Sequence, residues 1–69
     1  MNRRKDRIEF EYKKLKDGRY KVFIDYVSTN GDRDGTTDII SDFKTVQKHK
    51  AEAQRQAKRS NYSFSVKRL

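Results

Sequence analysis

The chain has 69 residues, with 18 Lys and Arg against 10 Asp and Glu, which gives a formal net charge of +8. It contains no cysteine, so neither a disulfide framework nor a thiolate metal site can stabilise it. A chain of this length supports one domain, residues 1–69, and its basic charge indicates a polyanionic partner such as nucleic acid. No apolar run approaches the ~18 residues of a membrane span. We therefore expect a cytoplasmic protein without a membrane partner.

The first six residues carry charge without apolar alternation, which predicts a flexible basic arm. In and beside this arm, the candidate phosphate-binding residues are Arg3, Arg4, Lys5 and Arg7.

Two segments, residues 7–13 and 19–27, alternate apolar and polar side chains with the period of two that is typical of half-buried strands. Asp17-Gly18 and Asn30-Gly31 are turn sequences, and they predict hairpin connections after each strand. The side chains expected to face a common core are Ile8, Phe10, Tyr12, Tyr20, Val22, Ile24 and Tyr26.

A third strand is predicted over residues 36–43, with Ile39 and Phe43 facing the core. The period then changes. Thr45 is expected to cap a helix that carries Val46, Ala53 and Ala57 on one narrow stripe and ends at Ser60-Asn61. Tyr62, Phe64 and Val66 alternate with polar residues and predict a last strand, with Phe64 and Val66 expected in the core. The expected fold is α+β with the order β-β-β-α-β: an antiparallel sheet of three to four strands with one helix on one face.

Basic residues dominate the helix surface away from the apolar stripe, which favours phosphate binding. These helix candidates are Lys44, Lys48, Arg55, Lys58 and Arg59. A second candidate is the sheet face away from the helix, where Lys21 and Phe23 combine a cation with an aromatic ring that could stack on a base.

Residues 25–42 are acidic, because five aspartates against Arg33 give a segment charge of −4. Asp32, Asp34 and Asp38 are therefore candidates for binding a protein partner, to which an exposed sheet edge could also add a strand.

Enzymatic chemistry is not expected, and neither is a cofactor or a metal site. His49 is the only histidine, and no second histidine or cysteine could complete a zinc site with it. Residues 30–35 resemble the start of a calcium-binding loop, but the twelfth position is Ser41 instead of a bidentate glutamate. We interpret this segment as a polar hairpin turn.

Residues 16–59 resemble the small arm-type DNA-binding domains at the N-terminus of phage and transposon integrases. The resemblance lies in Asp17-Gly18-Arg19-Tyr20, in Asn30-Gly31, and in a helix start, Asp42-Phe43-Lys44-Thr45, that leads into Ala51-Glu52-Ala53. It implies a sheet that reads the major groove of DNA through residues such as Lys21 and Phe23.

The helix-then-strand ending, residues 53–68, is similar to the small host RNA polymerase inhibitors of lytic phages, which bind protein. Two hypotheses therefore stand for a small phage or mobile-element protein. It binds nucleic acid, with DNA favoured over RNA, or it is a non-enzymatic inhibitor or adaptor that binds a host protein. Either a monomer or a homodimer is compatible with the sequence.

Overall fold

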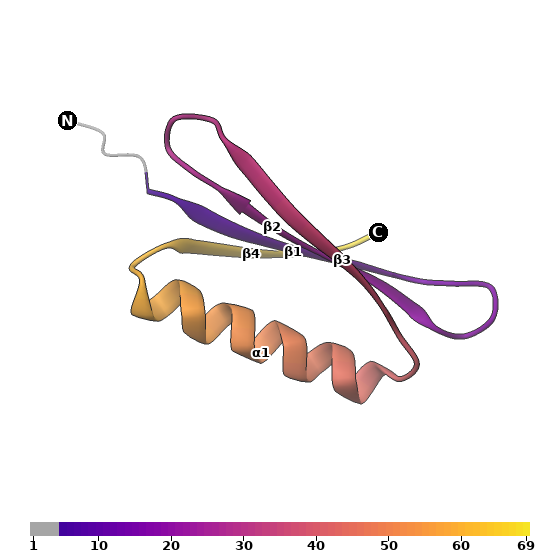
Figure 1. Ribbon diagram of the computed structural model, residues 1–69. Coiled ribbons are helices and arrows are strands. Elements are labelled where there is room, and N and C mark those ends of the chain that lie inside the picture. Colours follow the sequence, from indigo (N-terminus) through magenta and orange to yellow (C-terminus); the bar gives the residue numbers. More distant parts are fainter. Residues whose placement is uncertain (1–4) are drawn as a thin grey trace.

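The computed structural model describes residues 5–69, and within them a four-stranded sheet carries one helix on one face (Figure 1). The strands are β1 (Arg7–Lys14), β2 (Tyr20–Val27), β3 (Arg33–Ile40) and β4 (Ser63–Arg68), and the helix α1 spans Phe43–Arg59. The strand order across the sheet is β3-β2-β1-β4. The α+β class and the order β-β-β-α-β predicted from the sequence are confirmed.

The two predicted hairpin turns connect β1 to β2 and β2 to β3. Gly18 and Gly31 have φ angles of 91° and 95°, which side chains disfavour and glycine tolerates. The second turn is held by the Asn30 side chain, whose Oδ1 accepts a hydrogen bond of 3.1 Å from the backbone N–H of Asp32. Both turns therefore form for local reasons, and they set the antiparallel pairing of the first three strands.

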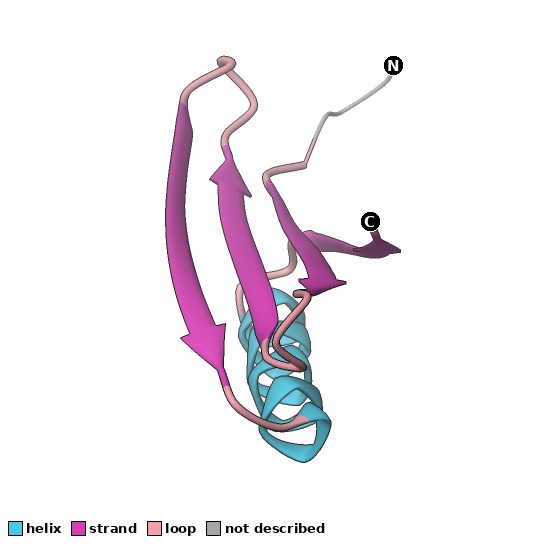
Figure 2. Ribbon diagram, turned by 90° about the vertical axis from the view of Figure 1, so that its right-hand side faces the viewer, coloured by secondary structure: helices cyan, strands magenta, loops and turns pink. Residues whose placement is uncertain are grey.

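The last strand departs from the expected antiparallel sheet, because β4 pairs parallel to β1, with Ile8 opposite Phe64 and Phe10 opposite Val66. The reason is the path of α1. The helix runs back beneath the sheet, so the chain returns to the end of the sheet where β1 also begins (Figures 1 and 2). A strand that starts there and lies beside β1 must run in the same direction.

The prediction for β3 was wrong in its bounds and in its inward face. Ile40, with 8% of its surface exposed, faces the core, whereas Ile39 is 47% exposed on the other side of the sheet. The register between β2 and β3 places Tyr20 opposite Ile40, and directly opposed residues share a face. Phe43 belongs to the first turn of α1, 40% exposed, where its ring lies 5.4 Å from that of Tyr20.

The helix begins one turn earlier than expected. Asp42 is its N-cap, and its Oδ1 accepts a hydrogen bond of 2.7 Å from the backbone N–H of Thr45. Thr45 thus donates to the cap and is not the cap itself. Hydrogen bonds from the Thr45 side chain and backbone hold the pKa of Asp42 below its usual range. The aspartate also precedes a first turn that has no acidic residue, where a negative charge complements the helix dipole.

The core lies between α1 and the sheet. It consists of Ile8, Phe10, Val22, Ile40, Val46, Ala53 and Ala57. Phe10 is fully buried, and the small side chains of Ala53 and Ala57 allow the helix to lie close to the sheet. Val66, expected in the core, is 43% exposed because β4 is an edge strand. No helix in the described part of the chain is both long enough and apolar enough to cross a membrane.

Candidate nucleic-acid interface

A row of basic side chains follows the outer surface of α1, opposite its buried stripe. Val46, Ala53 and Ala57 are buried against the sheet. With 3.6 residues per turn, the positions that point away from this stripe are those around 44, 48, 51, 55 and 59. The exposed cations of this surface, here called the basic ridge, are Lys44, Lys48, Arg55, Lys58 and Arg59. The fold thus gathers the predicted helix residues on one side of the molecule.

No carboxylate forms an ion pair with the cations of the basic ridge: none of the four ion pairs found among residues 5–69 involves a residue of α1. Lys58 and Arg59 lie in the last turn, where positive charge also complements the helix dipole. Arg59 lies 15 positions after Lys44, so the ridge extends about 22 Å at 1.5 Å per residue. Near its centre lies Ala51, an exposed residue that is too small to hold a ligand away from the helix.

Of the predicted arm, Arg3 and Arg4 lie outside the described residues. Lys5 is exposed, and its Nζ donates a hydrogen bond of 3.3 Å to Oδ1 of Asn61, just beyond the C-terminal end of α1. Lys5 therefore lies at the same end of the molecule as Lys58 and Arg59, where α1 ends (Figure 1).

Asp6, the last residue of the predicted arm, makes hydrogen bonds through its side chain and its backbone. Its carboxylate accepts a hydrogen bond of 3.0 Å from the Tyr26 hydroxyl and one of 2.9 Å from the backbone N–H of Thr29. Its carbonyl oxygen also accepts a hydrogen bond from the N–H of Ser63. These contacts tie the start of β1 to the ends of two other segments.

Arg7 lies on the sheet face away from α1, in an ion-pair network that joins three strands. Its Nε lies 2.9 Å from Oε2 of Glu9. Arg33 on β3 pairs with Glu9 as well and lies 3.3 Å from Oδ2 of Asp25 on β2. The hydrogen bond to Asp25 and the charge of Glu9 raise the pKa of Arg33. Arg7 is therefore already paired with the Glu9 carboxylate, and the sheet separates it from the basic ridge.

Lys21 and Phe23 lie on the same open face of the sheet as Arg7. Lys21 Nζ lies 5.4 Å from the centre of the Phe23 ring, a cation–π contact that occupies one surface of this ring. Strand pairing places Glu11 directly opposite Phe23 and Glu9 opposite Asp25. Carboxylates thus occupy the middle of this face among its cations, and the face has mixed charge, unlike the basic ridge. The structure does not bring this pair together with the basic ridge.

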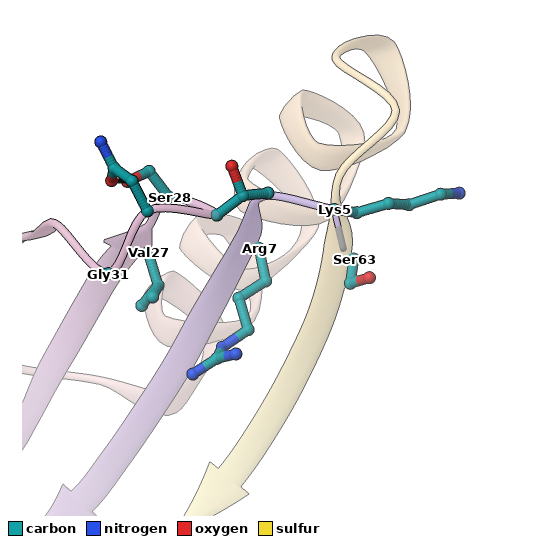
Figure 3. Close-up of a pocket in the computed structure, with 8 residues that line it drawn as sticks. Lys5, Arg7, Val27, Ser28, Gly31 and Ser63 are labelled. Carbon is teal, nitrogen blue, oxygen red and sulfur yellow. Dashed lines mark hydrogen bonds between the residues drawn. The ribbon is translucent and has the colours of Figure 1, made fainter. Parts of the chain in front are cut away.

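A hollow of about 510 Å³ lies where β1 begins and β2 ends, with Lys5 and Arg7 in its lining and the buried Val27 at its base (Figure 3). Figure 3 shows that the Lys5 and Arg7 side chains point away from each other. The two cations therefore do not converge on one position where an anion would bind.

The acidic candidates Asp32, Asp34 and Asp38 are all exposed along β3 and the turn before it. Two small hollows near them were not expected from the sequence. They have volumes of about 200 and 110 Å³ and share Ile8, Ile24 and Gln56 in their lining, and we call them together the β3–α1 groove. His49, Glu52 and Gln56 line the groove from α1. Their helical spacing places them on one flank of the helix, and this much could be predicted from the sequence. Only the structure shows which strand this flank faces.

Within residues 5–69, no group of three or more His, Cys, Asp or Glu side chains is arranged to hold a metal ion. In the segment that resembles a calcium loop, Asn30 Oδ1 is engaged with its own turn.

Comparison with known proteins identifies no relative: no family model matches the chain, and neither a curated protein nor a solved structure is similar to it.

Proposed function

We propose that this protein binds nucleic acid through the phosphate backbone, using the basic ridge of α1. The observation that supports this function best is the ridge itself: exposed cations on one surface of one rigid element, with no ion-pair partner among residues 5–69. Lysine and arginine groups that neutralise phosphates release counterions, and this release supplies most of the affinity of sequence-independent binding.

The ridge is suited to phosphate and not to bases. It contains no aromatic residue for stacking, and its long flexible cations contact phosphates without reading sequence. We therefore expect little sequence preference. With up to five cations engaged, log K should fall with log salt with a slope of about −4 to −5 on duplex DNA.

This proposal differs from the integrase resemblance, in which the sheet contacts DNA. On this chain, the open face of the sheet has mixed charge: Glu9, Glu11 and Asp25 lie there among cations, and Glu9 and Asp25 form ion pairs with Arg7 and Arg33. The helix side presents cations instead. In agreement with the sequence-based hypotheses, we propose that the favoured ligand is DNA. The protein would then be a cytoplasmic protein from a phage or mobile element.

The test is a fluorescence-anisotropy titration with labelled duplex DNA, single-stranded DNA and RNA of equal length, at low and near-physiological salt. The proposal expects micromolar or tighter binding at the higher salt, a slope near the value given above, and tighter binding to duplex DNA than to RNA. Binding that does not change with salt, or that vanishes for all ligands at near-physiological salt, would reject it.

A further inference from the structure

The edge strand β3 has the features of a docking site for another strand. It is the end strand of the sheet, and seven of its eight residues, Arg33 to Ile39, are exposed. Figure 2 shows β3 at the side of the sheet, with no other segment of the described chain beyond it. The outward backbone N–H and C=O groups of an end strand can pair with an added strand.

Natural proteins usually protect such an edge with proline, lysine, a bulge or a covering segment. The chain contains no proline, and β3 contains no lysine. Its one cation, Arg33, lies across the open face of the sheet in ion pairs with Glu9 and Asp25. The β3 edge is therefore accessible along its length.

The charge of β3 determines what it can accept. Asp34 and Asp38 lie opposite Tyr26 and Val22, so their side chains share the helix side of the sheet. In an antiparallel pair of two copies centred on Thr36, each Asp34 would lie opposite the Asp38 of the other copy. Like charges directly opposite each other are destabilising. The same carboxylates would stabilise a strand that carries lysine or arginine.

The β3–α1 groove lies beside this edge and adds a second means of recognition. Its base contains Ile8, Ile24 and Tyr26, and its sides contain Asp34 from β3 and Glu52 from α1. Alternate side chains of a strand added to β3 would project on the helix side, toward this groove. An apolar base with acidic sides suits an aliphatic chain that ends in a positive charge.

We propose that β3 binds an extended basic segment of another protein, added as a fifth strand, with lysine or arginine at alternate positions facing Asp34, Asp38 and Glu52. This site adjoins the basic ridge, since Glu52 and Gln56 also line a hollow with Arg55, Lys58 and Arg59, but it is formed by different residues from the ridge and does not depend on the proposed nucleic-acid function. A net charge of +8 repels a basic peptide, so such a peptide will bind only where acidic groups are concentrated.

The test uses the full chain, labelled with ¹⁵N, and synthetic peptides of about the length of β3 that alternate lysine with valine. A matched peptide replaces each lysine by glutamate. Two further peptides carry N-methyl groups on alternate amides, one on each of the two possible sets. Since successive amides of a strand point to opposite edges, each set of alternate amides lies on one edge, and a strand that pairs through one edge tolerates N-methylation of only one set.

The proposal expects the lysine peptide to bind about tenfold or more tightly than the glutamate peptide, with NMR shift changes in β3 and in the groove. One N-methylated peptide should bind like the parent, and the other should lose about tenfold or more in affinity. Equal affinities of the two, or shift changes confined to other surfaces, would overturn the proposal.

A double substitution, Asp34→Lys with Asp38→Lys, should weaken the lysine peptide by about tenfold or more. The control with the same charge change is Glu11→Lys with Asp17→Lys, placed away from the groove, and it should weaken the peptide much less. Equal weakening would show a general charge effect and overturn the proposal. Shift changes in β3 that depend on protein concentration without peptide would assign the edge to a second copy of the chain instead.

Discussion

The hydroxyl oxygens of Tyr26 on β2 and Tyr62 before β4 lie 2.5 Å apart and share a hydrogen bond. The rings meet edge to face at 5.2 Å, and the Tyr26 hydroxyl also donates to Asp6. The contact with Tyr62, burial, and the contact with Asp6 raise the pKa of Tyr26 above its ordinary value of 10.0. This cluster joins the start of β1, the end of β2 and the segment after α1.

Because the pKa of Tyr26 is higher in the folded than in the unfolded chain, its contribution to stability is complete below pH 10 and declines as the pH rises above 10.0. We expect the melting temperature to fall over this range by a larger amount in the wild-type protein than in Tyr26→Phe. Lysine residues lose their charge at a similar pH in both proteins, so Tyr26→Phe serves as the control for their effect on the melting temperature. Parallel pH curves for the two proteins would contradict this role of Tyr26.

The N-cap of α1 predicts a selective effect of Asp42→Ala. The substitution removes the acceptor for the Thr45 N–H and a negative charge at the positive end of the helix. We expect a fall of about 4–8 °C in the melting temperature at neutral pH. Ser41→Ala, at the preceding exposed position, should have little effect. If the two variants melt alike, Asp42 is not the cap.

The wild-type advantage over Asp42→Ala should also depend on pH. The pKa of Asp42 is lowered in the folded chain, so its stabilisation is present above the ordinary value of 3.8 and is lost as the pH falls below it. Thermal unfolding at neutral pH and at about pH 2 measures this change. A difference between the two proteins that persists at the acidic pH would contradict the assignment.

Phe10 and Ile39 provide a comparison of core and surface. Phe10→Ala removes a side chain with no exposed surface and should cost about 3–5 kcal/mol, enough to unfold a domain of this size. Ile39→Ala removes one that is 47% exposed on the open face and should change stability by about 0.5 kcal/mol or less. Circular dichroism in water shows whether Phe10→Ala is folded, and urea unfolding measures the losses for Ile39→Ala and Ile40→Ala. A larger loss for Ile39→Ala than for Ile40→Ala would contradict the register of β3.

Gly35 is predicted to matter because of Asp25. A Cβ atom at position 35 would overlap the Asp25 carboxylate, which also pairs with Arg33. We expect Gly35→Ala to lower the melting temperature by about 4 °C or less. In an Asp25→Ala background the same change should raise it, since alanine then only restricts the unfolded chain. The same effect in both backgrounds would exclude this contact as the cause.

The basic ridge can be tested in pairs. Lys44→Gln with Lys48→Gln, and Arg55→Gln with Arg59→Gln, should each weaken DNA binding and reduce the steepness of the salt slope by about 1.8. The matched control is Lys14→Gln with Lys16→Gln, which removes the same charge near the turn between β1 and β2. Salt titrations by anisotropy give the three slopes. A control slope that falls as much as the ridge slopes would mean that binding follows net charge alone.

The sequence predicted the faces of β1 and β2 correctly because their apolar residues alternate over a full strand length. In β3, two adjacent isoleucines leave the inward face undecided by alternation. The turn before β3 determines it: Ser28 pairs with Asp32 around three loop residues, 29–31, and this register places Ile40 opposite Tyr20. A two-residue turn at Asn30-Gly31 would instead place Ile39 opposite Val22, so the turn sequence alone does not predict the inward face. Likewise, the parallel pairing of β4 depends on where the helix returns the chain, which no local pattern specifies.

Site residues divide in the same way. Helical spacing alone placed the basic ridge on one surface, because the buried stripe of α1 was visible in the sequence. Whether the open face of the sheet binds a ligand could not be predicted from spacing in the same way. Whether Lys21 and Phe23 form a binding surface depends on which residues lie beside them, and the strand register supplies Glu11 there.

The parallel pairing of β4 with β1 also has a consequence for how the chain is made. Ribosomes release β1, β2 and β3 first, and these strands can pair through two short turns. During this time the side of Phe10 that will face the helix is in contact with water, because α1 and β4 have not yet emerged. The nascent sheet would therefore expose an apolar face until α1 and β4 have emerged, and this exposure favours aggregation during that interval.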